Sequence, residues 1–292
     1  MRQGTTLIFG ATGMLGSRLV PYLTSAGLTV VTAGRSAACQ TVVNRFDEIS
    51  ISKVLHEIQP EYIINLLAAT NVDTCEKDVG GAFKMNALIP SIISECIQSI
   101  KNPPYLVHIS TDQVYEGFGN NVENIVNPIN VYGLSKLVGE LMIHEGQGSV
   151  LRTNFFGRSY ASNRQSFSDW LYAAFVHKKR ITLFHDVIFS ALHMKTLCQM
   201  IHLAMQQRIL GVYNVGTRDS VSKARYAQLF SDLLGIPMGD AQVASITESA
   251  NFITKRPLNM SMNVNKLENV LGIKCPEMND EIIKTVKDYI NE

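Results

Sequence analysis

The sequence predicts an α/β fold, a doubly wound parallel sheet followed by a smaller α/β C-terminal lobe. The first observation is a strand, a glycine turn and a helix at the start of the chain, over residues 5–23. The second is the alternation of short β-branched strands with helical segments across residues 1–152, which is typical of βαβ units. The third is a central apolar strand that ends in two hydroxyl residues and a carboxylate. Together they predict a nucleotide-binding sheet with chemistry at one edge.

The first predicted strand, Thr5–Phe9, runs directly into the turn GATGMLG at residues 10–16. Its glycines let the backbone approach a pyrophosphate, whose charge is stabilised by the amides and the dipole of the following helix. The spacing is G-x-x-G-x-x-G rather than the commoner G-x-G-x-x-G. In this strand–turn–helix context it favours the coenzyme site of a Rossmann domain over a plain tight turn. The residues expected to contact the coenzyme here are Gly10, Gly13, Met14 and Leu15.

The second predicted strand, Leu28–Ala33, sets the coenzyme preference. NAD-specific folds commonly carry an acidic residue after this strand, where it binds the adenosine ribose hydroxyls. Here Arg35 and Ser36 stand instead, and a guanidinium with a hydroxyl can bind a 2′-phosphate. The pair therefore favours NADPH, with NADH as the alternative if Arg35 only faces solvent.

The next two predicted strands are Thr41–Arg45 and Glu61–Leu67. The second ends in Ala68, Ala69 and Thr70, whose small side chains leave room for a flat coenzyme near the backbone. A long helix is predicted from Ala82 to Ile100, stopped by Pro103 and Pro104.

The central strand, Tyr105–Ile109, delivers Ser110, Thr111 and Asp112 to its carboxyl end. Ligands of open α/β sheets bind at the carboxyl ends of the strands. We therefore expect the reaction to take place at this edge.

Tyr132 and Lys136 lie four residues apart in a helical pattern, so their side chains share one side of a helix. Leu137, Leu141 and Met142 are its expected apolar face. A free phenol has a pKa of about 10, and a neighbouring ammonium is expected to lower it until Tyr132 works as a general acid or base. Thr111 is positioned to hold a carbonyl oxygen against this phenol. A tyrosine and a lysine at this spacing also occur by chance in surface helices. The pair therefore indicates catalysis only together with the predicted coenzyme site.

The second half of the chain alternates between the sheet and the lobe. We assign residues 1–152 to the nucleotide-binding domain and 153–292 mainly to the lobe, with segments near 181–215 returning to the sheet. The expected elements are strands at Val150–Thr153 and Gly211–Val215 and helices at Asn163–Phe175, His193–Gln207 and Lys223–Leu234.

The bulk properties exclude several classes of protein. The 292 residues are 46% hydrophobic and 17% charged, with a net charge of +1, which gives no basic field for nucleic acid. The short cluster Lys178-Lys179-Arg180 reads as a solvated helix end. No apolar run approaches the roughly 18 residues of a membrane span, and the first strand leaves no room for a signal peptide. We therefore expect a cytoplasmic protein without a membrane partner.

Metal and disulfide chemistry are not expected. The five cysteines are scattered without a C-x-x-C pair and read as reduced thiols. The seven histidines are equally dispersed, and no set of ligands converges on His185 or His193.

Seven motifs in order give the chain a family resemblance. They are GATGMLG at 10–16, NLLAATNVDTCE at 65–76, Asn86 in KMNALIP, STDQVYEG at 110–117, NPINVYGLSKLVGE at 127–140, LRTNFFG at 151–157 and KRPLNMSMN at 255–263. Across most of its length the chain resembles the extended short-chain dehydrogenase/reductase superfamily, and within it the dTDP-4-dehydrorhamnose reductase family.

The resemblance implies NADPH-dependent reduction of the 4-keto group of a nucleotide-activated 6-deoxysugar, in deoxysugar and polysaccharide biosynthesis such as that of O-antigen lipopolysaccharide. It implies that Tyr132 donates the proton, that Lys136 binds the nicotinamide ribose and that Thr111 orients the oxygen. It further implies that Asp47 contacts the adenine and that Asn86 holds the active-site backbone and a water near the lysine. The residues that it implies for substrate binding are Asp112, Phe155 and Arg256. Arg256 has the alternative role of a surface ion pair. A nucleotide sugar is the expected partner, and a homodimer and a metal ion that assists assembly are left open.

Two other functions are compatible with this fold. Related dehydratases and epimerases retain NAD, and the dehydratases carry an Asp-Glu pair after the strand-end threonine. Here the pair is Asp112-Gln113, and an amide cannot act as that acid or base. A non-catalytic regulatory subunit, like that of methionine adenosyltransferase, is the other alternative, which the intact Thr111, Tyr132 and Lys136 disfavour.

Overall fold

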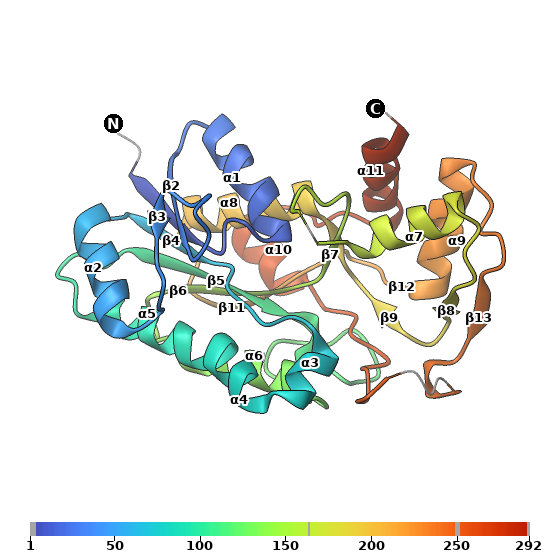
Figure 1. Cartoon of the computed structure of the whole chain (residues 1–292), viewed down its shortest axis with the longest axis horizontal. Helices are drawn as coiled ribbons and strands as arrows, with labels where there is room; N and C mark the ends of the chain where they lie inside the picture. Colours follow the sequence, from blue (N-terminus) through green and yellow to red (C-terminus); the bar gives the residue numbers. More distant parts are fainter. Residues whose placement is uncertain (1–3, 163, 249–251, 291–292) are drawn as a thin grey trace.

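A seven-stranded sheet forms the larger part of the protein in the computed structural model, which describes residues 4–162, 164–248 and 252–290 (Figure 1). Its strand order is β11-β6-β5-β4-β1-β2-β3, and all six pairings are parallel. The strands are β1 (Thr5–Phe9), β2 (Thr29–Gly34), β3 (Thr41–Val42), β4 (Tyr62–Asn65), β5 (Tyr105–Thr111), β6 (Gly148–Thr153) and β11 (Gly211–Val215). The order reverses between β1 and β4, which confirms the predicted doubly wound sheet and marks the crevice where such sheets bind ligands.

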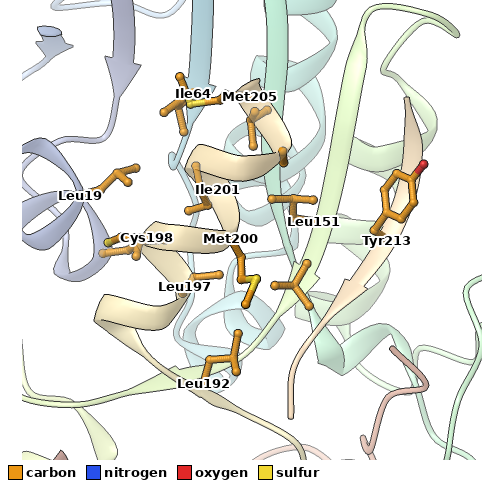
Figure 2. Close-up of a cluster of buried hydrophobic side chains, with 14 of the residues drawn as sticks. Leu19, Ile64, Leu151, Leu192, Leu197, Cys198, Met200, Ile201, Met205 and Tyr213 are labelled. Carbon is orange, nitrogen blue, oxygen red and sulfur yellow. The ribbon is translucent and has the colours of Figure 1, made fainter. Parts of the chain in front are cut away.

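Helices cover both faces of this sheet. One face carries α1 (Met14–Ser25), α8 (Met194–Gln207) and α10 (Asn265–Leu271), and the other carries α2 (Glu48–Ile58) and α5 (Ile89–Gln98), with α6 (Val131–Leu141) beside α5. In β1, Ile8 packs on the first face while Leu7 and Phe9 pack on the second, as strand alternation requires. Figure 2 shows α8 laying Leu197 and Ile201 between α1 and the strands.

The lobe has a hydrophobic core of its own, to the right in Figure 1. It is built on α7 (Phe167–Val176), α9 (Lys223–Leu234) and α11 (Met278–Ile290). Three two-stranded sheets complete it: β8 (Thr182–Phe184) with β13 (Gln242–Ala244), β9 (Ile188–Phe189) with β12 (Val221–Ser222), and β7 (Phe155–Phe156) with β10 (Leu192–His193). The chain returns to the main sheet with α8 and β11, and again with α10.

Several predicted elements differ in extent. The third strand is an edge strand of two residues, because β2 offers it only Ala33 and Gly34 as partners. The long helix predicted from Ala82 to Ile100 is interrupted: α3 (Val72–Lys77) and α4 (Val79–Phe83) lead into a π-helical turn at Lys84–Leu88 before α5 begins. Short 3₁₀ turns follow at Asp112–Val114 and Ile246–Glu248. Asn163, the predicted start of a lobe helix, lies outside the described residues; α7 begins after its N-cap Ser166, with a capping box.

The expected apolar face of α6 is wrong for two of its three residues; only Leu137 is partly buried, against Val114, Tyr115 and Met262. Leu141 is 71% exposed, and Met142, just beyond the helix, is 42% exposed. The buried face is mostly polar and carries Tyr132, Ser135, Lys136, Gly139 and Glu140. Burial of charged side chains is tolerated here because each has a partner: Lys136 a backbone carbonyl, and Glu140 an arginine.

Candidate active site

A cavity of about 360 Å³ lies where the carboxyl ends of β1, β4, β5 and β6 meet the lobe. From the sheet side it is lined by the glycine turn, by the strand-end residues after β4 and β5, and by Tyr132 and Lys136 of α6. From the lobe side it is closed by Phe155 and residues 164–167. Sequence-predicted residues that line it are Gly10, Gly13, Met14, Leu15, Ala68, Thr70, Thr111, Asp112, Tyr132, Lys136 and Phe155.

The glycine turn leaves helix α1 uncapped at the cavity. Gly10 has a φ of +84°, and a side chain there would come within 3.0 Å of the Leu66 backbone. Gly13 is the N-cap of α1 and offers no side-chain oxygen to the first amides of the helix. The free amides and the positive end of the dipole therefore form an anion site.

Thr111 and Asp112 end β5 inside the cavity and are both buried. The Thr111 hydroxyl accepts from the Gln113 amide (3.2 Å) and donates to Asp112 Oδ1 (3.3 Å). Asp112 Oδ2 accepts from Asn154 Nδ2 at 2.7 Å. Burial raises the pKa of the Asp112 carboxyl to about 6, although the Asn154 hydrogen bond and the charge of Lys223 oppose this.

Tyr132 differs from expectation in its ionisation. Burial raises the pKa of its phenol to about 12, although a hydrogen bond with the Thr111 side chain lowers it, and the Asp112 charge raises it further. The expectation that Lys136 depresses this pKa is therefore wrong, because desolvation dominates and Lys136 is not among the groups that act on the phenol. The phenol is protonated at neutral pH, which is the form that a proton donor needs.

Lys136 is turned toward the backbone of β5. Its side chain is 2% exposed, and Nζ donates to the Ile109 carbonyl at 2.7 Å. Burial lowers the pKa of the Lys136 ammonium to about 8, with the Glu140 charge opposing.

His108 is a neighbour of this lysine that the sequence reasoning missed. Asn65 Oδ1 accepts from the Leu67 amide, so the Asn65 amide nitrogen faces His108 Nδ1 at 3.1 Å and donates to it. The imidazole proton then belongs on Nε2, 3.5 Å from Lys136 Nζ. Burial and the lysine charge hold the pKa of His108 well below its usual range. The only signal in the sequence was a histidine in an apolar strand.

Asn86 lies behind the cavity, fully buried in the π-helical turn. Its side chain accepts from the Ala69 amide (2.8 Å) and donates to the Ala69 carbonyl (3.0 Å) and to Ser135 Oγ (3.0 Å). It thus ties the loop after β4 to α6. Gly139 makes this approach possible, since a side chain there would come within 2.0 Å of the Asn86 carbonyl.

Five predicted coenzyme residues do not line the cavity: Ala69 and Asn86, which lie behind it, and Arg35, Ser36 and Asp47. Arg35 and Ser36 are exposed at the carboxyl end of β2, and no carboxylate among the described residues pairs with Arg35. Asp47 is the N-cap of α2, where its Oδ1 accepts from the Ser50 amide at 2.9 Å. The hydrogen bonds with Ser50 lower the pKa of this carboxyl.

A second cavity, of about 230 Å³, lies in the lobe. It shares Gln113, Asn154 and Phe167 with the first cavity, so the two adjoin. Arg256 lines it and pairs with Asp73 (Nη2–Oδ2 2.8 Å). Lys223 also lines it and was missed, because the sequence placed it at the start of an ordinary lobe helix.

Among the described residues no group of three or more metal-ligating side chains gathers, and none of the helices there is long and apolar enough to cross a membrane. All five cysteines are buried free thiols.

The doubly wound sheet, the glycine turn at its switch point and the Thr111, Tyr132 and Lys136 side chains in one cleft define an extended short-chain dehydrogenase/reductase fold. The chain belongs to the family described as RmlD substrate binding domain, whose family model matches residues 4–291.

Known relatives and a solved structure agree with this family. The probable low-salt glycan biosynthesis reductase Agl14 of Haloferax volcanii is 24% identical, over 94% of this chain and 95% of its own. The β subunit of methionine adenosyltransferase 2 from Rattus norvegicus is also 24% identical, over 91% of this chain and 82% of its own. The crystal structure of dTDP-4-dehydrorhamnose reductase from Bacillus anthracis in complex with NADP superposes with a TM-score of 0.86, at 23% identity, over 97% of this chain and 98% of that one.

Proposed function

We propose that this protein reduces the 4-keto group of a nucleotide-activated 6-deoxysugar with NADPH as the coenzyme. The observation that carries the proposal is the meeting of Thr111, Tyr132 and Lys136 with the uncapped start of α1 in one cavity. The relatives that are named as a glycan biosynthesis reductase and as a dTDP-4-dehydrorhamnose reductase support the same reaction class.

The residues present fit a dinucleotide. The first amides of α1 have no side-chain cap and suit the pyrophosphate, and Gly10 keeps the backbone turn free of side chains. Ala68, Ala69 and Thr70 border the nicotinamide side, held in place by Asn86. Arg35, with Ser36, is free to bind a 2′-phosphate, and Asp47 lies on the adenine side. When bound, the dihydronicotinamide supplies a hydride to the carbonyl carbon.

The protein's own residues handle the carbonyl oxygen. Tyr132 donates its phenolic proton to that oxygen, which it can do at neutral pH because burial raises the pKa of the phenol to about 12. Thr111 fixes the oxygen against the phenol by a hydrogen bond. The Lys136 ammonium, held by the Ile109 carbonyl, binds the nicotinamide ribose.

The substrate extends from this cleft into the lobe. Asp112 and Phe155 line the cleft beside the reacting sugar, and Arg256 in the adjoining cavity binds the diphosphate through its guanidinium. The Asp73 partner of Arg256 holds the guanidinium in place.

The test is coenzyme turnover with a panel of dTDP-, UDP- and GDP-linked 4-keto-6-deoxysugars, followed by the absorbance of the reduced coenzyme. We expect oxidation of NADPH with at least one of them, and a rate about 10²–10⁴-fold lower with the Tyr132→Phe variant. Absence of turnover with every member would contradict the proposal. The same preparation, given a nucleotide-linked 4-hydroxyhexose, should form no 4-keto-6-deoxy product, since Gln113 cannot serve as the acid or base of a dehydratase.

A regulatory role is the second candidate function. It is supported by the similarity, over 91% of this chain, to the β subunit of methionine adenosyltransferase 2, which is named as a subunit. Coenzyme binding without turnover of any sugar nucleotide is the result that would favour it.

A further inference from the structure

Lys223, the first residue of α9, projects its ammonium into the wall of the lobe cavity. Its Nζ lies 3.8 Å from the centre of the Phe189 ring and 4.3 Å from that of Phe167. The two rings hold the charge in one position.

The Lys223 ammonium forms no ion pair with the described part of the chain. Among the residues that the structure describes, no carboxylate lies within ion-pair distance of Nζ and no oxygen accepts a hydrogen bond from it. The Asp112 charge acts on Lys223 from a distance and raises its pKa, but burial outweighs it and brings the pKa to about 8. Lys223 is half-buried, and a cation that is partly withdrawn from water without an ion-pair partner is costly, so this position favours an anionic ligand.

The same cavity holds a second incompletely paired cation. Arg256 uses Nη2 for Asp73, while its buried Nη1 has no hydrogen-bond partner. The remaining wall is largely aromatic and aliphatic, with Trp170 and Phe184 among its residues. Lys223 and Arg256 are the charged residues of this lining, and no carboxylate of the described residues lines the cavity. The carboxylates whose charge reaches the two cations lie outside it; they are Asp73, Glu76 and Asp112.

We propose that Lys223 binds the diphosphate of the nucleotide sugar together with Arg256, so that two cations from different elements contact it. This inference rests on the proposed function. The order of the cavities supports it: Gln113 and Asn154 lie between the Tyr132 cleft and the two cations, as a diphosphate follows the reacting sugar in a nucleotide sugar. The aromatic wall is then left for the nucleoside.

The experiment measures binding by calorimetry, without coenzyme and without turnover. The ligands are dTDP, UDP and GDP, each paired with its own nucleoside, and UDP-glucuronate as a sugar nucleotide with a carboxylate. Lys223→Met keeps the stem that packs on the rings and removes the charge. We expect it to weaken binding of the preferred diphosphate by about tenfold or more, as for loss of a charge-assisted hydrogen bond, and to leave the nucleoside affinity unchanged. Lys223→Arg should retain most of the diphosphate affinity.

Lys266→Met is the matched control, because Lys266 also lies over an aromatic ring, 4.6 Å from the centre of Tyr213, but outside both cavities. It should bind every ligand as the wild type does. If Lys223→Met does not fold, Lys223→Gln replaces it, with the thermal unfolding midpoint as the check.

Three outcomes would overturn the inference: unchanged diphosphate affinity, an equal loss for nucleoside and diphosphate, or a loss confined to UDP-glucuronate with UDP unaffected. The last would assign Lys223 to a sugar carboxylate. None of these binding measurements needs catalysis. A failure of the Lys223 inference can therefore be distinguished from a failure of the proposed reductase activity.

Discussion

Arg152 and Glu140 form a buried ion pair beside the elements that carry the three residues proposed for catalysis. Arg152 Nη2 lies 2.6 Å from Glu140 Oε2, and Nε contacts both carboxylate oxygens at 3.0 Å. Glu140 stands one turn after Lys136 on α6, and it also accepts a hydrogen bond from Ser110, next to Thr111. The pair therefore fixes α6 against the strand ends that deliver the active site.

Glu140→Gln should destabilise the protein strongly, since it leaves the Arg152 guanidinium buried without its counter-charge. Removing one partner of a buried pair costs about 3–5 kcal/mol of unfolding free energy. Chemical denaturation of wild type and variant measures the difference. The control is Glu57→Gln, which breaks the exposed pair with Lys53 (3.8 Å; side chains 56% and 72% exposed) and should cost less than about 1 kcal/mol. Equal effects of the two variants would mean that the Arg152–Glu140 pair adds nothing to stability.

Arg35→Ala should weaken binding of NADPH but not of NADH. A charge-assisted contact to phosphate contributes roughly 1.5–3 kcal/mol, so the NADPH affinity should fall about tenfold or more. Titration of both coenzymes by calorimetry gives the comparison, and Arg180→Ala, an exposed arginine of the lobe, is the control. An equal loss of affinity for both coenzymes would contradict the proposal that Arg35 binds the 2′-phosphate.

Reduction should slow as the pH rises through about 8. The pKa of Lys136 is lowered to about 8, so the ammonium is charged below that pH and loses its proton above it. The phenol, with a pKa of about 12, stays protonated throughout this range. The profile of kcat/KM against pH in the free enzyme reports this group. Lys136→Met should lower activity and coenzyme affinity together, and its kcat/KM should no longer decline near pH 8. If kcat/KM of this variant still declined near pH 8, another group would be responsible for the titration.

The sequence was sufficient for the parts of the site that depend on local pattern. The glycine turn, the carboxyl end of β5 and the Tyr132–Lys136 spacing are each written in a few consecutive residues, and the structure brings them to one cavity. The parts that depend on distant contacts could not be predicted. The polar face of α6 is an example, because Glu140 is buried only where Arg152 of β6 faces it.

The interruption at Lys84–Leu88 has the same origin. Helical periodicity continues through this segment, so the sequence indicates one long helix. The π-helical turn places Asn86 where it can bond the Ala69 backbone and Ser135, two contacts made by residues far away in the chain. The ionisation of Tyr132 was likewise unpredictable, since the spacing to Lys136 says nothing about desolvation.

Tyr132→Phe tests the proton donor directly. The change keeps the buried ring and removes only the hydroxyl, so coenzyme affinity and the thermal unfolding midpoint should stay close to wild type. General acid catalysis typically contributes about 10²–10⁴-fold, and kcat should fall by that factor. Single-turnover measurement with reduced coenzyme isolates the reduction step from product release. Tyr22→Phe, on α1 outside the cavity, removes a hydroxyl in the same way and should leave kcat unchanged. If Tyr132→Phe kept full activity, the phenol would be a packing group, and the proton would have to come from another donor in the cleft, with the raised pKa of Asp112 making its carboxyl the first to test.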